Sequence, residues 1–96
     1  MAEKPEKLRA RVVVTGRVQG VWFRGTTCEQ ARQAGVRGWV RNRRDGAVEA
    51  VFEGDRQAVM QVLSWCYRGP TMARVDNVDV TWEKPTGEFA GFDLRW

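Results

Sequence analysis

The chain carries the stretch GWVRNRRDGAVEAVFE at residues 38–53, near the middle of its 96 residues. Two strand-like segments flank the dipeptide Asp45-Gly46, and Asp-Gly between such segments is a strong signal for a β-hairpin. We therefore expect one strand at residues 38–42 and another at residues 47–53, with a turn at residues 43–46 between them. The rest of the fold can be placed around this hairpin.

A helix is expected on each side of the hairpin, because apolar residues recur at helical spacing in both places. The first helix spans residues 23–34 and ends at Gly35, a residue suited to a C-terminal cap. The second spans residues 56–67, after Gly54-Asp55 and before Gly69-Pro70. Their apolar faces carry, in chain order, Phe23, Thr27, Cys28, Ala31 and Ala34, then Val59, Val62, Leu63 and Cys66.

Three further strands complete the pattern. One covers residues 8–15, ahead of the first helix, and a short final strand covers residues 89–96. The fourth strand contains an irregularity where alternation breaks, and its apolar residues are Val75, Val78, Val80 and Trp82. The first six elements follow the order β-α-β-β-α-β, which predicts an α+β fold of the ferredoxin-like, split βαβ type, in which an antiparallel sheet carries two helices on one face.

Length and charge limit the class of protein. Residues 1–7 are polar and contain Pro5, so we expect a flexible N-terminal arm followed by one domain over residues 8–96. The net charge of +4 favours an anionic partner, which a small phosphorylated substrate and a nucleic acid both satisfy. No apolar run is long enough to span a membrane, and without a signal peptide the cytoplasm is the expected location.

The sequence contains no histidine. Imidazole bases, histidine metal ligands and the Ser-His-Asp and Cys-His nucleophile arrangements are therefore excluded, and any catalysis must use other groups. Cys28 and Cys66 are too few and too far apart for a zinc site. Both lie on apolar helix faces, so we expect buried free thiols, with a disulfide as the alternative if the two helices pack side by side.

A glycine-bounded turn connects the first strand to the first helix, with the sequence GRVQGVWFR at residues 16–24. Gly16 and Gly20 allow backbone conformations that are closed to other residues. Successive backbone N–H groups and the helix N-terminus could then surround one anion, and Arg24 offers a planar fork of donors that matches phosphate oxygens. The dinucleotide fingerprint and the Walker loop are both missing. On these local grounds, a phosphate cradle and a purely structural turn are open alternatives.

The motifs at residues 16–24 and 38–42, followed by Asp45-Gly46, Gly69-Pro70 and the terminal sequence FDLRW, together resemble the acylphosphatase family. The resemblance covers nearly the whole chain. It implies a small enzyme without metal or cofactor. Such an enzyme hydrolyses acyl phosphates, the mixed anhydrides of a carboxylic acid and phosphate, to a carboxylate and inorganic phosphate.

The resemblance also implies a role for each site residue. Arg24 would bind the phosphate and Asn42 would position the attacking water, both as catalytic residues. The loop backbone would cradle the phosphate through Gly16, Arg17, Val18, Gln19, Gly20, Val21, Trp22 and Phe23. The substrate's own phosphate would take the proton, in keeping with the absence of histidine. Contact between Asn42 and the loop does not follow from the strand pattern and rests on the resemblance.

The sequence leaves two alternatives to a free-standing enzyme open. A ferredoxin-like sheet can bind RNA, so the first alternative is a phosphate- or RNA-binding module without catalysis. The aromatic-rich RNP signature is missing, and nucleic acid is not the expected partner. The second alternative is a domain that serves a larger maturation enzyme, but no partner domain is encoded in this sequence. A monomer is the expectation, while the sequence leaves the oligomeric state and the physiological acyl phosphate open.

Overall fold

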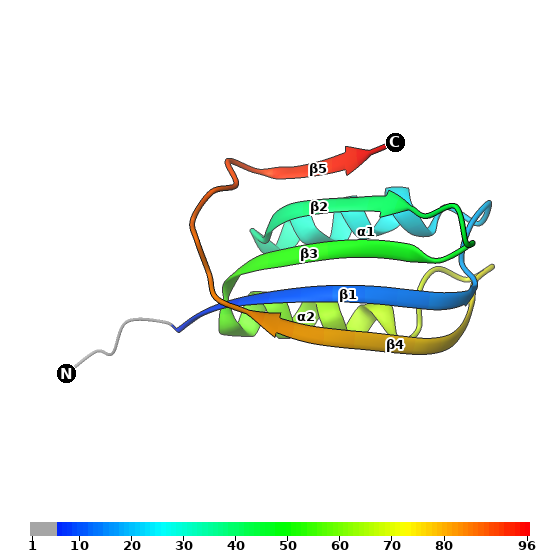
Figure 1. Cartoon of the computed structure of the whole chain (residues 1–96), viewed down its shortest axis with the longest axis horizontal. Coiled ribbons are helices and arrows are strands. Elements are labelled where there is room, and N and C mark those ends of the chain that lie inside the picture. Colours follow the sequence, from blue (N-terminus) through cyan, green and yellow to red (C-terminus); the bar gives the residue numbers. More distant parts are fainter. Residues whose placement is uncertain (1–5) are drawn as a thin grey trace.

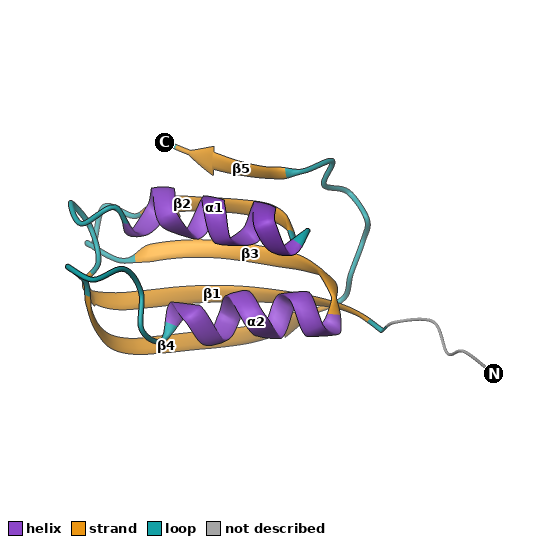
Figure 2. Ribbon diagram, turned by 180° about the vertical axis from the view of Figure 1, so that it is seen from behind, coloured by secondary structure: helices purple, strands orange, loops and turns teal. Residues whose placement is uncertain are grey.

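A five-stranded sheet with two helices on one face makes up residues 6–96, the part of the chain that this computed structural model describes (Figure 1; Figure 2). The elements in chain order are β1 (Lys7–Arg17), α1 (Phe23–Ala34), β2 (Arg37–Asn42), β3 (Val48–Asp55), α2 (Arg56–Cys66), β4 (Arg74–Glu83) and β5 (Phe92–Arg95). The ferredoxin-like α+β architecture predicted from the sequence is confirmed. Residues 1–5 of the predicted N-terminal arm lie outside the described residues.

Several element boundaries differ slightly from those expected. β1 begins at Lys7, one residue earlier than predicted. α2 ends at Cys66, and β5 is confined to Phe92–Arg95. The expected irregularity in β4 is a bulge, because its pairing with β1 shifts register between Thr15 and Gly16. The predicted elements themselves are all present.

The strands lie in the order β4-β1-β3-β2-β5. The first four of these pair antiparallel, as expected, whereas β5 pairs parallel to β2. This direction follows from the path of the chain. β4 ends where β1 and β2 begin, and the segment after it crosses to the opposite edge of the sheet (Figure 1). β5 therefore enters beside the start of β2 and runs the same way, which makes the sheet mixed.

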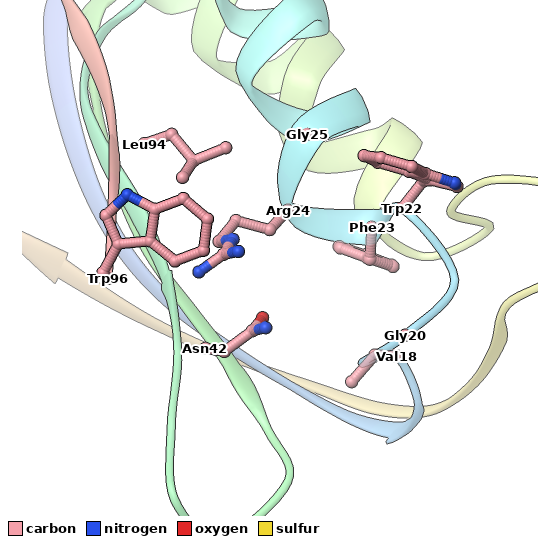
Figure 3. A pocket seen from close by; sticks show the side chains of 9 residues that line it. All are labelled: Val18, Gly20, Trp22, Phe23, Arg24, Gly25, Asn42, Leu94 and Trp96. Carbon is pink, nitrogen blue, oxygen red and sulfur yellow. The ribbon is translucent and has the colours of Figure 1, made fainter.

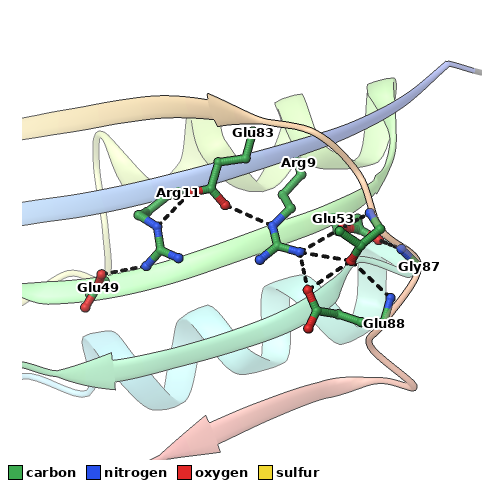
Figure 4. Close-up of polar contacts among 8 residues, drawn as sticks. Arg9, Arg11, Glu49, Glu53, Glu83, Gly87 and Glu88 are labelled. Atoms are coloured by element: carbon green, nitrogen blue, oxygen red, sulfur yellow. Dashed lines mark hydrogen bonds and ion pairs between the residues drawn. The ribbon is translucent and has the colours of Figure 1, made fainter.

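The two faces of the sheet differ in chemistry, because side chains alternate along each strand. The face under α1 and α2 carries the core, in which Val12, Val40 and Phe52 are fully buried. The opposite face, which neither α1 nor α2 covers, carries arginine and glutamate side chains that pair with one another (Figure 4). Consecutive ion pairs there join Arg9, Glu83, Arg11, Glu49 and Arg41. Ion pairs between side chains thus cover the face of the sheet opposite α1 and α2.

Glu49 is buried in this charged face, with only 7% of its surface exposed. It accepts hydrogen bonds from Arg11 at 2.9 Å and from Arg41 at 2.9 and 2.6 Å. Burial alone would raise the pKa of Glu49, but the hydrogen bonds from Arg41 and Arg11 outweigh it and hold the pKa below its usual value. The folded protein therefore favours the charged form of this carboxyl group.

We expect acid to remove the stability that Glu49 contributes. Because its pKa is lower in the folded chain, the contribution is complete above the unfolded pKa of 4.5 and disappears as the pH falls through the folded pKa. The Glu49→Gln variant should be less stable than the parent at pH 7 by about 1 kcal/mol. Urea unfolding of both proteins from neutral to acidic pH measures this. A difference that stays constant down to the most acidic pH would contradict the expectation.

Cys28 and Cys66 are free thiols, and both are buried. The expectation of buried thiols is therefore confirmed over the disulfide alternative. Burial raises the pKa of the Cys66 thiol to about 12, so it stays protonated and unreactive at neutral pH. These thiols belong to the core.

Candidate functional site

The carboxyl ends of β1 and β2 lie at the same end of the sheet. Val14 of β1 and Asn42 of β2 both pair with Val48, from the two sides of β3. The loop that follows β1 therefore starts beside Asn42. Since Val40 is buried under the helices and side chains alternate along a strand, the side chain of Asn42 points to the face that carries α1.

Two residues fix the path of the loop after β1. Gly16 has φ 127°, and a side-chain carbon there would come within 2.2 Å of the carbonyl oxygen of Arg74. The side-chain amide of Gln19 donates hydrogen bonds to the carbonyl oxygens of Arg43, at 2.6 Å, and Ala47, at 2.9 Å. The glycine lets the loop approach β4 closely, and the glutamine ties it to the turn between β2 and β3.

The start of α1 presents unpaired backbone donors. Trp22, the N-cap, has φ 64° and ψ 18°, in the left-handed region that bulky residues rarely adopt, and its side chain makes no capping hydrogen bond. Within the described part of the chain, the backbone N–H groups of residues 18–25 donate to no other protein group. Such a helix N-terminus carries partial positive charge and is suited to binding an anion.

A cavity of about 560 Å³ lies between this loop, the start of α1 and the ends of β2 and β5 (Figure 3). Its lining residues are Val18, Gly20, Trp22, Phe23, Arg24, Gly25, Asn42, Leu94 and Trp96. Arg24 is the one charged side chain among these lining residues. Its Nη1 donates to the carbonyl oxygen of Arg95 at 3.2 Å, and its guanidinium carbon lies 4.2 Å from the ring centre of Trp96. The hydrogen bond to the backbone of Arg95 therefore holds the arginine at the cavity.

Asn42 supplies the second polar side chain of the cavity. Its Oδ1 is buried and accepts no hydrogen bond from residues 6–96. Buried polar atoms nearly always have a partner, and this oxygen is free to accept a hydrogen bond from a water or ligand. An amide can accept a hydrogen bond from water through its oxygen and donate through its NH₂, but it is no strong base. The cavity thus combines a cation with a neutral group suited to orienting water.

The predicted site residues fall into two groups. Those that line the cavity are Val18, Gly20, Trp22, Phe23, Arg24 and Asn42. Those that do not are Gly16, Arg17, Gln19 and Val21. Gly16 and Gln19 set the path of the loop, Val21 is buried, and Arg17 is exposed at the end of β1.

Gly25, Leu94 and Trp96 also line the cavity, although the sequence analysis did not include them in the site. Gly25 could have been found, because it directly follows Arg24 in the first turn of α1. Phe92, Leu94 and Trp96 are every second residue of the final segment, a spacing that predicts that their side chains share one face of a strand. No local signal, however, says that the final strand joins the edge of β2 beside Arg24.

The site contains no evident place for a metal ion. Among residues 6–96, no group of three or more histidine, cysteine or acidic side chains could hold one. None of the side chains that line the cavity is a carboxylate or a thiol. The polar chemistry of the cavity therefore comes from a guanidinium, an amide and backbone groups.

No helix of the described chain has the length and apolar character needed to cross a membrane.

The chain is similar to known proteins along nearly its whole length. The family model described as Acylphosphatase matches residues 10–94. An acylphosphatase of Roseiflexus sp. (strain RS-1) is 61% identical over 88 residues, which cover 92% of this chain and 95% of the relative. The acylphosphatase structure from Bacillus subtilis has a TM-score of 0.89 and 32% identity, covering 93% of this chain and 99% of that chain. The one from Coxiella burnetii has a TM-score of 0.88 and 34% identity, covering 93% of each. The chain therefore belongs to the acylphosphatase family.

Proposed function

We propose that this protein hydrolyses acyl phosphates at the cavity, with Arg24 and the loop of residues 16–23 holding the phosphate and Asn42 positioning the attacking water. One observation carries the assignment of these roles. The guanidinium of Arg24, the free N–H groups at the start of α1 and the unpartnered Oδ1 of Asn42 all border the same space. Cation, anion-binding backbone and water-orienting amide are the three groups that the reaction needs.

Phosphate binding uses charge and geometry together. The guanidinium of Arg24 offers two parallel N–H donors to two phosphate oxygens, while the loop and helix N–H groups bind the remaining oxygens. A cation at a helix N-terminus opposes the helix dipole, so an anion between them stabilises both. None of the lining side chains is a carboxylate, so none of them repels a phosphate.

Hydrolysis needs a water molecule in line with the bond that breaks. Oδ1 of Asn42 accepts a hydrogen bond from the water, which turns a lone pair of the water oxygen toward phosphorus. As the oxygen bonds to phosphorus, the P–O bond to the acyl group breaks, and the acyl oxygen leaves as a carboxylate with the bonding electrons. The proton of the water passes to a phosphate oxygen of the substrate, since an amide is too weak a base to keep it.

The proposed reaction uses neither metal nor cofactor. A carboxylate is a good leaving group, so the protein mainly has to neutralise the phosphoryl charge and hold the water. Arg24 and the backbone donors provide that neutralisation. A guanidinium and one amide are also a poor ligand set for a metal ion.

We extend the proposal to a monomer that acts in the cytoplasm and has no nucleic-acid partner. RNA-binding ferredoxin-like sheets stack bases on exposed aromatic residues. On the open face here, Trp39 is only 8% exposed, and the guanidinium carbons of Arg11, Arg41 and Arg95 lie 5.8, 5.9 and 4.8 Å from its ring centre. The ring therefore offers no free stacking surface. The monomeric state and the cytoplasmic location follow the sequence-based expectation alone.

The test is release of inorganic phosphate from acetyl phosphate and from benzoyl phosphate by the purified chain, with EDTA present. We expect enzymatic turnover of both substrates, undiminished by the chelator and independent of added RNA. If neither substrate is turned over, a phosphate- or RNA-binding module becomes the better description. RNA binding would then be recognised by an affinity that falls steeply with added salt.

A further inference from the structure

Most side chains that line the cavity are apolar, and a phosphate group does not need them. Arg24, Asn42 and the backbone donors account for the polar interactions. The apolar lining side chains are Val18, Trp22, Phe23, Leu94 and Trp96. The volume of about 560 Å³ also lies within the range of about 300–1,000 Å³ typical of small-molecule sites. The cavity therefore has room and apolar surface for the group that is attached to the phosphate.

Trp96 is the apolar lining residue that stacks on the guanidinium of Arg24, the group expected to bind the phosphate. Its ring centre lies 4.2 Å from the guanidinium carbon of Arg24, so a group joined to a phosphate on Arg24 begins beside the indole. Leu94 lies next to it in the cavity lining (Figure 3). Trp96 is 94% exposed, which leaves most of the ring free for a further contact. Trp22, by contrast, lies on the other side of Arg24, beside Gly25 (Figure 3).

We propose that Trp96, supported by Leu94, binds the acyl group and makes the enzyme prefer acyl phosphates that carry an aromatic acyl group. This inference rests on the proposed function. In-line attack by a water at Asn42 places the acyl group away from that residue, and so toward the apolar rim of the cavity. An aromatic ring gains more than a methyl group from an exposed indole, through both the area it covers and the stacking geometry.

Substrate preference in matched variants tests the inference. The measured quantity is the ratio of kcat/KM for benzoyl phosphate to kcat/KM for acetyl phosphate. We expect Trp96→Ala to lower this ratio about threefold to tenfold, and Trp96→Phe to retain most of it. Trp82→Ala is the matched control, because Trp82 is a half-exposed tryptophan that pairs with Ala10 at the opposite end of the sheet. That variant should keep the parental ratio.

Inhibition by inorganic phosphate separates acyl binding from positioning of the arginine. Phosphate lacks an acyl group, so its inhibition constant should be the same in the parent and in Trp96→Ala. A parallel weakening of phosphate inhibition and of both substrates would show that Trp96 acts only by holding Arg24, and would overturn the inference. Turnover of both substrates without any aromatic preference in the parent would also overturn it while leaving the proposed function intact. If neither substrate is turned over, the inference and the proposed function are both contradicted.

Discussion

Replacing Arg24 by alanine is expected to lower kcat/KM for acetyl phosphate by about a thousandfold or more, the scale on which a phosphoryl-binding arginine contributes. No other charged side chain lines the described cavity, so no neighbour can take over the charge. Steady-state kinetics measures the loss. Isothermal titration with inorganic phosphate should show binding to the parent and none to the variant.

Two further variants decide whether charge alone is sufficient at this position. Arg24→Lys should also fail, because an ammonium is a point charge and cannot bind the carbonyl of Arg95 and two phosphate oxygens in one plane. Arg44→Ala is the matched control, since Arg44 is exposed in the β2–β3 turn and does not line the cavity. Recovery of phosphate binding in Arg24→Lys would contradict the role given to the planar fork.

Replacing Asn42 by alanine is expected to lower kcat by about a hundredfold or more while phosphate affinity stays near the parental value. The amide oxygen orients the water, and without it the water has no fixed direction of attack. Arg24 and the loop remain in place, so the phosphate still binds. Single-turnover kinetics with benzoyl phosphate measures the chemical step, and competitive inhibition by inorganic phosphate measures the affinity.

The contrast between the two positions is the sharpest check on the mechanism. Arg24→Ala should lose both affinity and turnover, whereas Asn42→Ala should lose turnover alone. Equal losses of phosphate affinity in both variants would contradict the separate roles. Asn77→Ala serves as the control for the second variant, because Asn77 is an exposed asparagine of β4 that lies outside the cavity.

Local signals in the sequence were sufficient for the elements. The hairpin at Asp45-Gly46 follows from turn chemistry, and both helices follow from the spacing of apolar residues. The parallel pairing of β5 with β2 could not be predicted, because it depends on how the chain crosses the end of the sheet. The sequence likewise did not show that Asn42 lies beside the loop after β1. That position follows from the pairing of both Val14 and Asn42 with Val48.

Parts of the site and of the open face depend on contacts between distant segments. Trp96 is far from Arg24 in sequence, and no pattern near either residue indicates that they meet. Glu49 and Arg41 resemble ordinary surface charges on an alternating strand. The structure buries Glu49 because Arg11, from a strand on the other side, approaches the same carboxylate.

The strand order has a consequence for how this enzyme folds. Among the described pairings, only β2 with β3 joins strands that are consecutive in the chain. β1 pairs with β3 and β4, which both come later in the sequence. Sheets built from such distant segments fold more slowly than helical bundles of similar length. During synthesis β1, with valines at 12–14, leaves the ribosome long before its partners, and both of its edges are open to other chains. Yield in the cell can therefore be limited by the rate of folding even when the finished enzyme is stable.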